Sequence, residues 1–317
     1  MRKHLAILLT FALTILTAHA QMKVGMAISM APSAQFAGYY VAKEKGFFLN
    51  EGLDVIFYHI GLSSNQNYMD LIKNKTCQFM EGNLFLALEG VDLGIRSVNI
   101  LQSSQTSSVF IASNEPIEDL TQIKGKNIGV WKRNDNFYER ILRNDLDKSN
   151  SWIPSLQVLD VFMAGGMNAI LGNTHTELIR LYLSTGQLKK EDQIVRFENT
   201  PYNFPEDGLY TTQEFYKANK DKAQAFASAV QKGWEYARKN VKDAVAIVMK
   251  YTREANVASN NYQQKLILEE VLRLQQNDKG EATYEPISEE AFDIITQEMR
   301  RVGMLKSSVK YEDIIAR

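Results

Sequence analysis

The sequence predicts an α/β fold in which helices pack on a parallel or mixed sheet. Between residues 31 and 210, short apolar runs typical of strands alternate with segments whose apolar residues recur at helical spacing. The 317 residues are enough for two lobes or for one large domain, because domains typically hold roughly 100 to 200 residues. The sequence has one cysteine, Cys77, so a packed core and not intramolecular disulfides must stabilise the fold.

Residues 1–20 have the parts of a secretory signal peptide. Arg2, Lys3 and His4 form a positive start, residues 5–16 are apolar, and residues 18–20 (A-H-A) form a small-x-small cleavage site. The alternative is a membrane anchor, but the apolar run is short for a bilayer span. We therefore expect cleavage after residue 20. No cysteine follows the apolar region, so we expect no lipid attachment and a protein free in the periplasm of a double-membraned bacterium.

Charge and composition exclude several classes of protein. Residues 1–20 contain two basic residues, and without them the chain has 34 Lys and Arg against 37 Asp and Glu, a net charge of −3. A net negative charge does not favour binding to nucleic acid. No other segment is long and apolar enough to cross a membrane. No Cys/His cluster offers a metal site, so we expect no metal and no cofactor. Cys77 lies in an apolar segment and is expected to be a small buried residue, not a reactive thiol.

The stretch 31–60 predicts one helix followed by one buried strand. Ser33 is the expected N-cap, and Gly46 is the expected glycine at the C-terminal end of the helix. Gly52 closes a short turn. Residues 55–60 are almost continuously apolar, which is typical of a strand covered on both faces in a parallel sheet.

The remaining elements follow in order. The first unit is expected to contain helices at 65–73 and 83–88, and strands at 77–80, 98–102 and 109–113. The second unit, from residue 114, is expected to contain helices at 134–146 and 173–185, and strands at 157–162, 167–171 and 194–197. Amphipathic helices that pack on a sheet are expected at 223–238, 241–251, 262–274 and 289–302.

No residue pattern requires catalysis. After residue 20 the only histidines are His59, in an apolar strand, and His175, at the start of a helix. The sequence contains no GxSxG, Walker A or HExxH motif. We therefore expect a binding protein and not an enzyme.

Three segments carry a resemblance to a known family. Residues 35–48 read Q-F-A-G-Y-Y-V-A-K-E-K-G-F-F, residues 119–130 read D-L-T-Q-I-K-G-K-N-I-G-V, and residues 204–212 read F-P-E-D-G-L-Y-T-T. The chain resembles, from residue 22 to about residue 314, the periplasmic solute-binding proteins of ABC transporters in the nitrate, sulfonate, taurine and thiamine-pyrimidine group, which includes SsuA and thiamine-pyrimidine-synthase-like proteins.

The resemblance implies a type II periplasmic binding protein fold, in which crossover strands join two α/β lobes with a ligand cleft between them. Residues 21–113 and 208–317 would form lobe 1, and residues 114–207 would form lobe 2. Such a protein would capture a small organic solute, with a thiamine pyrimidine precursor as the first expectation. It would be a monomer and deliver the solute to an ABC permease in the inner membrane.

Three alternatives remain open within this resemblance. A sulfonate-, nitrate- or taurine-binding protein would need cationic or N–H donors in the cleft. A pyrimidine-synthase-like enzyme of the same fold would need a cysteine-rich iron motif, and a lysine that residues 61–66 do not offer. A ligand-sensing module would need a separate signalling partner.

Ligands of α/β sheets lie at the carboxyl ends of strands, against helix N-termini, so we expect the site in the loops that follow strands. Trp131 and Phe36 offer stacking faces, whereas a helix cap or a turn is the alternative role for each polar candidate. The predicted ligand-binding residues are Ser29, Gln35, Phe36, Asn83, Gln105, Ser107, Trp131, Asn134, Asn173 and Glu177.

Comparison with the thiamine-pyrimidine branch of the family gives a specific role to Glu177 and bears on the identity of the ligand. Asn173 and Glu177 resemble a segment that lines the cleft in that branch, which implies that Glu177 accepts a ligand N–H in a charge-assisted hydrogen bond. The branch's first loop resembles D-W-x-P-N-x-N-H-x-G. Here Pro32 and Gly38 match it, and its acidic, Trp, Asn and His positions do not, which disfavours a pyrimidine ligand.

Overall fold

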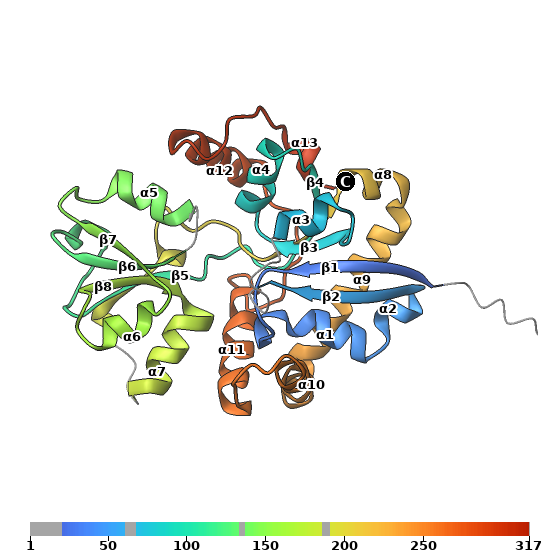
Figure 1. Ribbon diagram of the computed structural model, residues 1–317, viewed down its shortest axis with the longest axis horizontal. Helices are drawn as coiled ribbons and strands as arrows, with labels where there is room; N and C mark the ends of the chain where they lie inside the picture. The colour runs from blue at the N-terminus through green and yellow to red at the C-terminus, as the bar shows by residue number, and fades with distance from the viewer. Residues whose placement is uncertain (1–20, 61–67, 133–136, 186–190, 317) are drawn as a thin grey trace, which may run out of the picture.

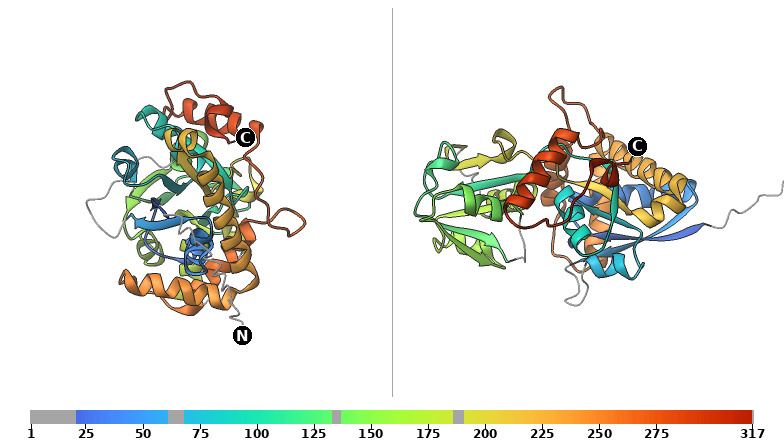
Figure 2. Two further views of the ribbon diagram at one scale, coloured as in Figure 1. Left: turned by 90° about the vertical axis from the view of Figure 1, so that its right-hand side faces the viewer. Right: turned by 90° about the horizontal axis from the view of Figure 1, so that it is seen from above.

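The computed structural model describes residues 21–60, 68–132, 137–185 and 191–316, and these form two five-stranded sheets with helices packed around them. The two sheets lie in separate parts of the molecule, one drawn mainly in blue and the other mainly in green (Figure 1). The view from above shows the same separation (Figure 2). The predicted α/β class is confirmed.

The first sheet has the strand order β2-β1-β3-β10-β4. β1 pairs in parallel with β2 and β3, whereas β10 runs antiparallel between β3 and β4. Its strands are β1 (Met22–Ile28), β2 (Leu53–His59), β3 (Phe79–Gly82), β4 (Ser97–Gln102) and β10 (Gly208–Thr212).

The second sheet has the order β7-β6-β8-β5-β9, and it repeats this arrangement. β6 pairs in parallel with β7 and β8, whereas β5 runs antiparallel between β8 and β9. Its strands are β5 (Val109–Ser113), β6 (Asn127–Trp131), β7 (Ser151–Ser155), β8 (Ala169–Asn173) and β9 (Ile194–Arg196).

The antiparallel strand of each sheet is the one that enters from the other sheet. Residues 103–108 cross from β4 to β5, and residues 197–207 cross back from β9 to β10. The sequence-based division placed 109–113 in lobe 1, but these residues pair with β8 and β9. We therefore propose that lobe 2 begins after the first crossover, at about residue 109, and we keep its end at residue 207.

Helices cover the sheets on both sides. α1, α9 and α10 lie on one side of the first sheet, and α3, α4 and α12 lie on the other (Figure 1). The helices are α1 (Ala37–Glu44), α2 (Phe47–Asn50), α3 (Tyr68–Lys73), α4 (Leu84–Asp92), α5 (Phe137–Asp145), α6 (Val158–Met163), α7 (Ile179–Thr185), α8 (Gln213–Ala218), α9 (Lys220–Lys239), α10 (Val241–Glu254), α11 (Asn261–Leu274), α12 (Glu289–Arg301) and α13 (Tyr311–Ile314). Short 3-10 turns occur at η1 (Ala34–Phe36), η2 (Leu120–Gln122), η4 (Glu191–Gln193) and η5 (Phe197–Asn199), and a π-helical turn at η3 (Thr174–Leu178).

The local signals in residues 31–60 are mostly confirmed. The side chain of Ser33 accepts a hydrogen bond from the Gln35 N–H and caps η1. Gly46 and Gly52 both have a φ of +73°, which glycine adopts without strain. The prediction that the following strand is covered on both faces is wrong, because β2 is an edge strand and Ile56 is 44% exposed.

Two further differences concern strands. The predicted strand at 157–162 is the helix α6, in which Val158, Leu159 and Phe162 face the core at helical spacing. The strand of this region is β7, which begins at Ser151. β1 is not among the predicted strands, although its last five residues are buried in the first sheet.

The other predicted elements agree with the structure to within a few residues, and α9 to α12 occupy the four predicted C-terminal helices. The expected signal peptide, residues 65–67 and residues 134–136 lie outside the described residues. Within the described part of the chain, no helix has the length and hydropathy of a membrane span.

Candidate functional site

A cavity of about 250 Å³ lies between the two sheets. Its walls come from the carboxyl ends of β1 and β3 in the first sheet, the ends of β6 and β8 in the second, and the second crossover. This is where ligands bind in open α/β sheets. The lining residues are Ser29, Met30, Gln35, Glu81, Gly82, Asn83, Phe85, Leu86, Glu89, Val109, Trp131, Phe137, Tyr138, Leu171, Gly172, Asn173, His175, Glu206 and Asp207.

The structure brings five of the predicted residues together in this cavity: Ser29, Gln35, Asn83, Trp131 and Asn173. Ser29, Gln35 and Asn83 belong to the first lobe, whereas Trp131 and Asn173 are the last residues of β6 and β8 in the second sheet. Asn83 also has the alternative role, because its Oδ1 accepts a hydrogen bond from Leu86 N at 3.0 Å and caps α4.

Four predicted residues lie elsewhere among the described residues. Phe36 is buried in the core beside the His59 ring. The Gln105 side chain donates to the Glu285 carbonyl at 2.6 Å. Ser107 and Glu177 are buried and do not line the cavity. The tenth, Asn134, lies outside the described residues.

Glu177 holds two lining residues in place. Its Oε1 accepts from Trp131 Nε1 at 2.8 Å, and its Oε2 accepts from the Asn173 N–H at 2.8 Å and from Thr176 Oγ1 at 2.7 Å. The chain packs closely here, since a Cβ added at Gly172 would lie 2.8 Å from Glu177 Cβ. Both carboxylate oxygens are thus occupied by donors of the protein. Glu177 therefore positions Trp131 and Asn173, whereas direct contact with a ligand is what its resemblance to the thiamine-pyrimidine branch implies.

The cavity is also lined by acidic residues that are not among the predicted ligand-binding residues: Glu81, Glu89, Glu206 and Asp207. Glu81 Oε2 accepts from Ser29 N at 3.2 Å and from Ser29 Oγ at 2.6 Å. Burial raises the pKa of Asp207 well above its usual range, and the negative charges of Glu81 and Glu206 raise it further. The only sequence signals were the E-D pair within the crossover motif F-P-E-D-G-L-Y and the position of Glu81 near a strand end.

Glu206 joins the two crossovers. Its Oε1 accepts from Ser107 Oγ and Tyr138 OH, both at 2.9 Å, and its Oε2 accepts from Ser108 N at 3.0 Å and Ser108 Oγ at 2.5 Å. Burial raises the pKa of Glu206, although these four hydrogen bonds oppose that shift. The second crossover is therefore tied to the first and to α5 through one side chain.

Aromatic rings from both lobes meet beside the cavity. Phe85 of α4 stacks on Phe137 of α5, with ring centroids 4.8 Å apart and an interplanar angle of 24°. Tyr138 contacts both rings edge to face. Together with Trp131 these rings make the cavity suitable for a flat organic solute.

Two buried polar atoms of residues that line the cavity have no hydrogen-bond partner within the described part of the chain. Gln35 is 7% exposed, and its Oε1 makes no hydrogen bond with the described residues. The Gln35 side chain also opposes the rise in the pKa of Asp207. His175 is 3% exposed and its Nδ1 is unpaired. Burial lowers the pKa of His175 to about 4, so the ring is neutral at pH 7.

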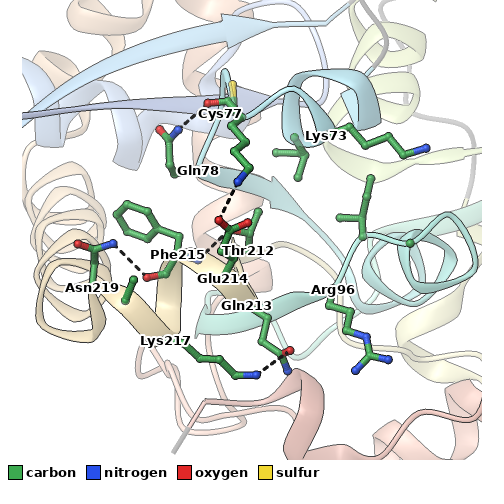
Figure 3. A pocket seen from close by; sticks show the side chains of 15 residues that line it. Lys73, Cys77, Gln78, Arg96, Thr212, Gln213, Glu214, Phe215, Lys217 and Asn219 are labelled. Carbon is green, nitrogen blue, oxygen red and sulfur yellow. Dashed lines mark hydrogen bonds and ion pairs between the residues drawn. The ribbon is translucent and has the colours of Figure 1, made fainter.

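A larger hollow of about 620 Å³ lies at the opposite end of the first sheet. Lys73, Arg96 and Lys217 surround it, and Glu214 is paired with Lys75 at 2.7 Å (Figure 3). All of its walls belong to the first lobe, and it lies at the amino ends of β3 and β4. Cys77 is buried, as expected, and this burial raises the pKa of its thiol to about 12. We therefore place the functional site between the sheets.

The profile of the protein family described as "NMT1/THI5 like" matches residues 33–244 of the chain. Among curated proteins, the chain is similar to the riboflavin-binding protein RibY of Chloroflexus aurantiacus. The two are 22% identical over 283 residues, which cover 81% of this chain and 74% of RibY.

Solved structures show the same architecture. The periplasmic aliphatic sulphonate binding protein SsuA of Escherichia coli superposes with a TM-score of 0.67 at 11% identity, covering 90% of this chain and 94% of SsuA. The ligand-binding component of an ABC-type import system from Staphylococcus aureus superposes with a TM-score of 0.64 at 12% identity, covering 93% of this chain and 97% of that protein. The expected periplasmic binding protein fold is confirmed. RibY and SsuA are binding proteins by name, in agreement with the expectation for this chain.

Proposed function

The chain belongs to the NMT1/THI5-like family, and from this premise we propose that it is the solute-binding component of an ABC importer. It captures a small organic solute between its two lobes and delivers it to a permease in the inner membrane. Residues 1–20 direct its export to the periplasm and are then removed. The observation that carries this proposal is the cavity whose walls come from both sheets.

A solute in this cavity would contact both lobes at once. Such a ligand favours the closed arrangement of the lobes, because it gains its full set of contacts only when both walls are in place. The two crossovers are the segments that absorb the motion. Closure around the solute then gives the permease a signal that the protein is loaded.

For the solute we propose a thiamine pyrimidine precursor, a flat aminopyrimidine. Trp131, Phe85 and Phe137 offer aromatic surface, and Glu81 and Asp207 offer acceptors for amino groups. A sulfonate, nitrate or taurine ligand is less favoured, because no Lys or Arg of the described residues lines the cavity.

A thermal-shift screen of residues 21–317 tests the binding function. The panel contains hydroxymethyl- and aminomethyl-pyrimidines, thiamine, riboflavin, taurine, alkanesulfonates and nitrate. A ligand at 100 times its Kd adds roughly 2.7 kcal/mol to the free energy of unfolding, which gives a clear rise in Tm. A shift with any member supports the binding function, and a shift with a pyrimidine alone supports the proposed solute. No shift with any member would contradict the proposal.

Replacing Trp131 by alanine is expected to weaken binding of the solute at least about tenfold. The stacking of a base on an aromatic side chain contributes roughly 1–3 kcal/mol, and about 1.4 kcal/mol corresponds to tenfold in affinity. The matched control is Trp152→Ala, since Trp152 lies on the neighbouring strand β7 and does not line the cavity. Isothermal titration calorimetry measures both variants. Equal losses of affinity in the two variants would remove Trp131 from the site.

A further inference from the structure

Two buried polar side chains line the cavity from opposite lobes. Gln35 belongs to η1, just before α1 of the first lobe, and His175 belongs to η3, which follows β8 of the second sheet. Both side chains are more than nine-tenths buried. Ligand pockets typically contain a few such polar groups, which fix the orientation of the ligand.

One polar atom of each side chain is unpaired. Gln35 Oε1 and His175 Nδ1 make no hydrogen bond within the described part of the chain. A buried polar atom without a partner destabilises a folded protein, and most such atoms in native proteins are paired. Because both residues line the cavity, one solute between the lobes can contact both side chains and supply the missing hydrogen bonds.

His175 lies in a rare kind of turn that is held on both sides. η3 is π-helical, and single π-helical turns occur frequently at functional sites. Glu177 Oε2 accepts from the Asn173 N–H and from Thr176 Oγ1, so the residues on either side of His175 are held in place. The imidazole is thus positioned before a solute arrives, which lowers the entropic cost of binding.

The two side chains offer different hydrogen-bonding groups. Gln35 Oε1 can only accept, so its partner must carry an N–H or an O–H. Burial lowers the pKa of His175 to about 4, so at pH 7 the imidazole is neutral, with one nitrogen that donates and one that accepts. A hydroxyl both donates and accepts, and it therefore suits His175 in either tautomer.

We propose that Gln35 and His175 determine the specificity of the cavity, and that its solute is a flat ring with an amino group against Gln35 Oε1 and a hydroxyl against His175. A hydroxymethyl-substituted aminopyrimidine has this chemistry. A ring with only one of the two groups would leave a polar atom of the wall buried and unpaired, so the site rejects it. The inference rests on the proposed function and names the residues that select the solute of the same cavity.

Three probes test this specificity on residues 21–317 by isothermal titration calorimetry. They are hydroxymethyl-aminopyrimidine, its analogue without the amino group and its analogue without the hydroxyl. We expect each analogue to bind about tenfold more weakly than the parent probe, which corresponds to about 1.4 kcal/mol. Equal affinity for the parent and either analogue would overturn the inference and leave the binding function standing. Silence of all three probes, with a Tm shift by another member of the thermal-shift panel, would do the same, whereas silence of the whole panel would contradict both.

Gln35→Met and His175→Phe remove the two polar groups and keep most of the side-chain volume. We expect each variant to bind the parent probe about tenfold more weakly. Gln35→Met should change the affinity for the analogue without the amino group by less than about twofold, and His175→Phe should do the same for the analogue without the hydroxyl. His175→Asn restores a polar atom near the position of Nδ1 and should recover most of the affinity.

Thr296→Val is the matched control for both variants. Thr296 of α12 is also 3% exposed, and its Oγ1 has no partner among the described residues, but it does not line the cavity. We expect this variant to change the affinity for none of the probes, and the Tm without solute shows whether each variant is folded. Equal losses for all three probes in Gln35→Met or His175→Phe would show that the replaced residue has only a structural role.

Discussion

Replacing Glu206 by alanine is expected to lower the free energy of unfolding by about 3 kcal/mol or more and to weaken solute binding as well. The change leaves the Ser108 N–H and the hydroxyls of Ser107, Ser108 and Tyr138 without their common acceptor. Each buried donor that loses its partner costs about 1–3 kcal/mol, although rotation of hydroxyls recovers part of the loss. The two crossovers would lose the side chain that joins them, so the lobes would close less precisely around a solute.

Glu206→Gln is the matched control for this prediction. A glutamine oxygen can accept from Ser108 N, and its amide can donate to the Tyr138 hydroxyl, which can turn to accept. Because burial already raises the pKa of Glu206, a neutral side chain of the same shape is expected to be tolerated better. Urea unfolding monitored by fluorescence measures all three proteins. Equal and small effects of alanine and glutamine would show that Glu206 does not stabilise the crossovers.

Replacing Gly233 by alanine is expected to destabilise the protein by about 3 kcal/mol or more. α1 and α9 cross at this point, and a Cβ on residue 233 would lie 2.0 Å from the Gly38 carbonyl oxygen. Backbone atoms cannot move aside as a flexible side chain can, so the two helices must separate. Overpacking of a core typically costs 1–3 kcal/mol, and a clash with backbone exceeds that range.

Gly90→Ala is the control, because Gly90 also lies within a helix and gains the same intrinsic preference of about 1 kcal/mol for alanine. The nearest atom to its added Cβ is the Ile95 carbonyl oxygen at 3.3 Å, which a small adjustment accommodates. We expect Gly90→Ala to leave the Tm unchanged or to raise it, and Gly233→Ala to lower it by several degrees. Similar Tm values for the two variants would show that the α1–α9 crossing can relax.

The sequence predicts well those features that depend on neighbouring residues. Ser33 caps its helical turn as expected, and the amphipathic helices α9 to α12 lie where their spacing predicts. The apolar run at 157–162 is predicted as a strand, because a short apolar run is compatible with a strand or with a buried helix. Packing against the second sheet, which the sequence does not show, selects the helix α6.

The candidate site depends even more on contacts between residues that are distant in sequence. Positions at strand ends identified Ser29, Asn83, Trp131 and Asn173, since the topology brings such ends together. The acids Glu81 and Asp207 were missed, because only the placement of β3 beside the returning crossover brings the two carboxylates together. Glu177 was given a direct role in binding since sequence cannot show that Trp131 and Asn173 occupy its oxygens.

The most direct test of the account is a crystal structure of residues 21–317 with the probe that gives the largest thermal shift. We predict that the probe lies between the sheets, with its ring beside Trp131 and its N–H groups within hydrogen-bond distance of Asp207 or Glu81, so that it contacts both lobes. A probe bound in the basic hollow around Lys73 and Arg96, or on one lobe alone, would contradict the account.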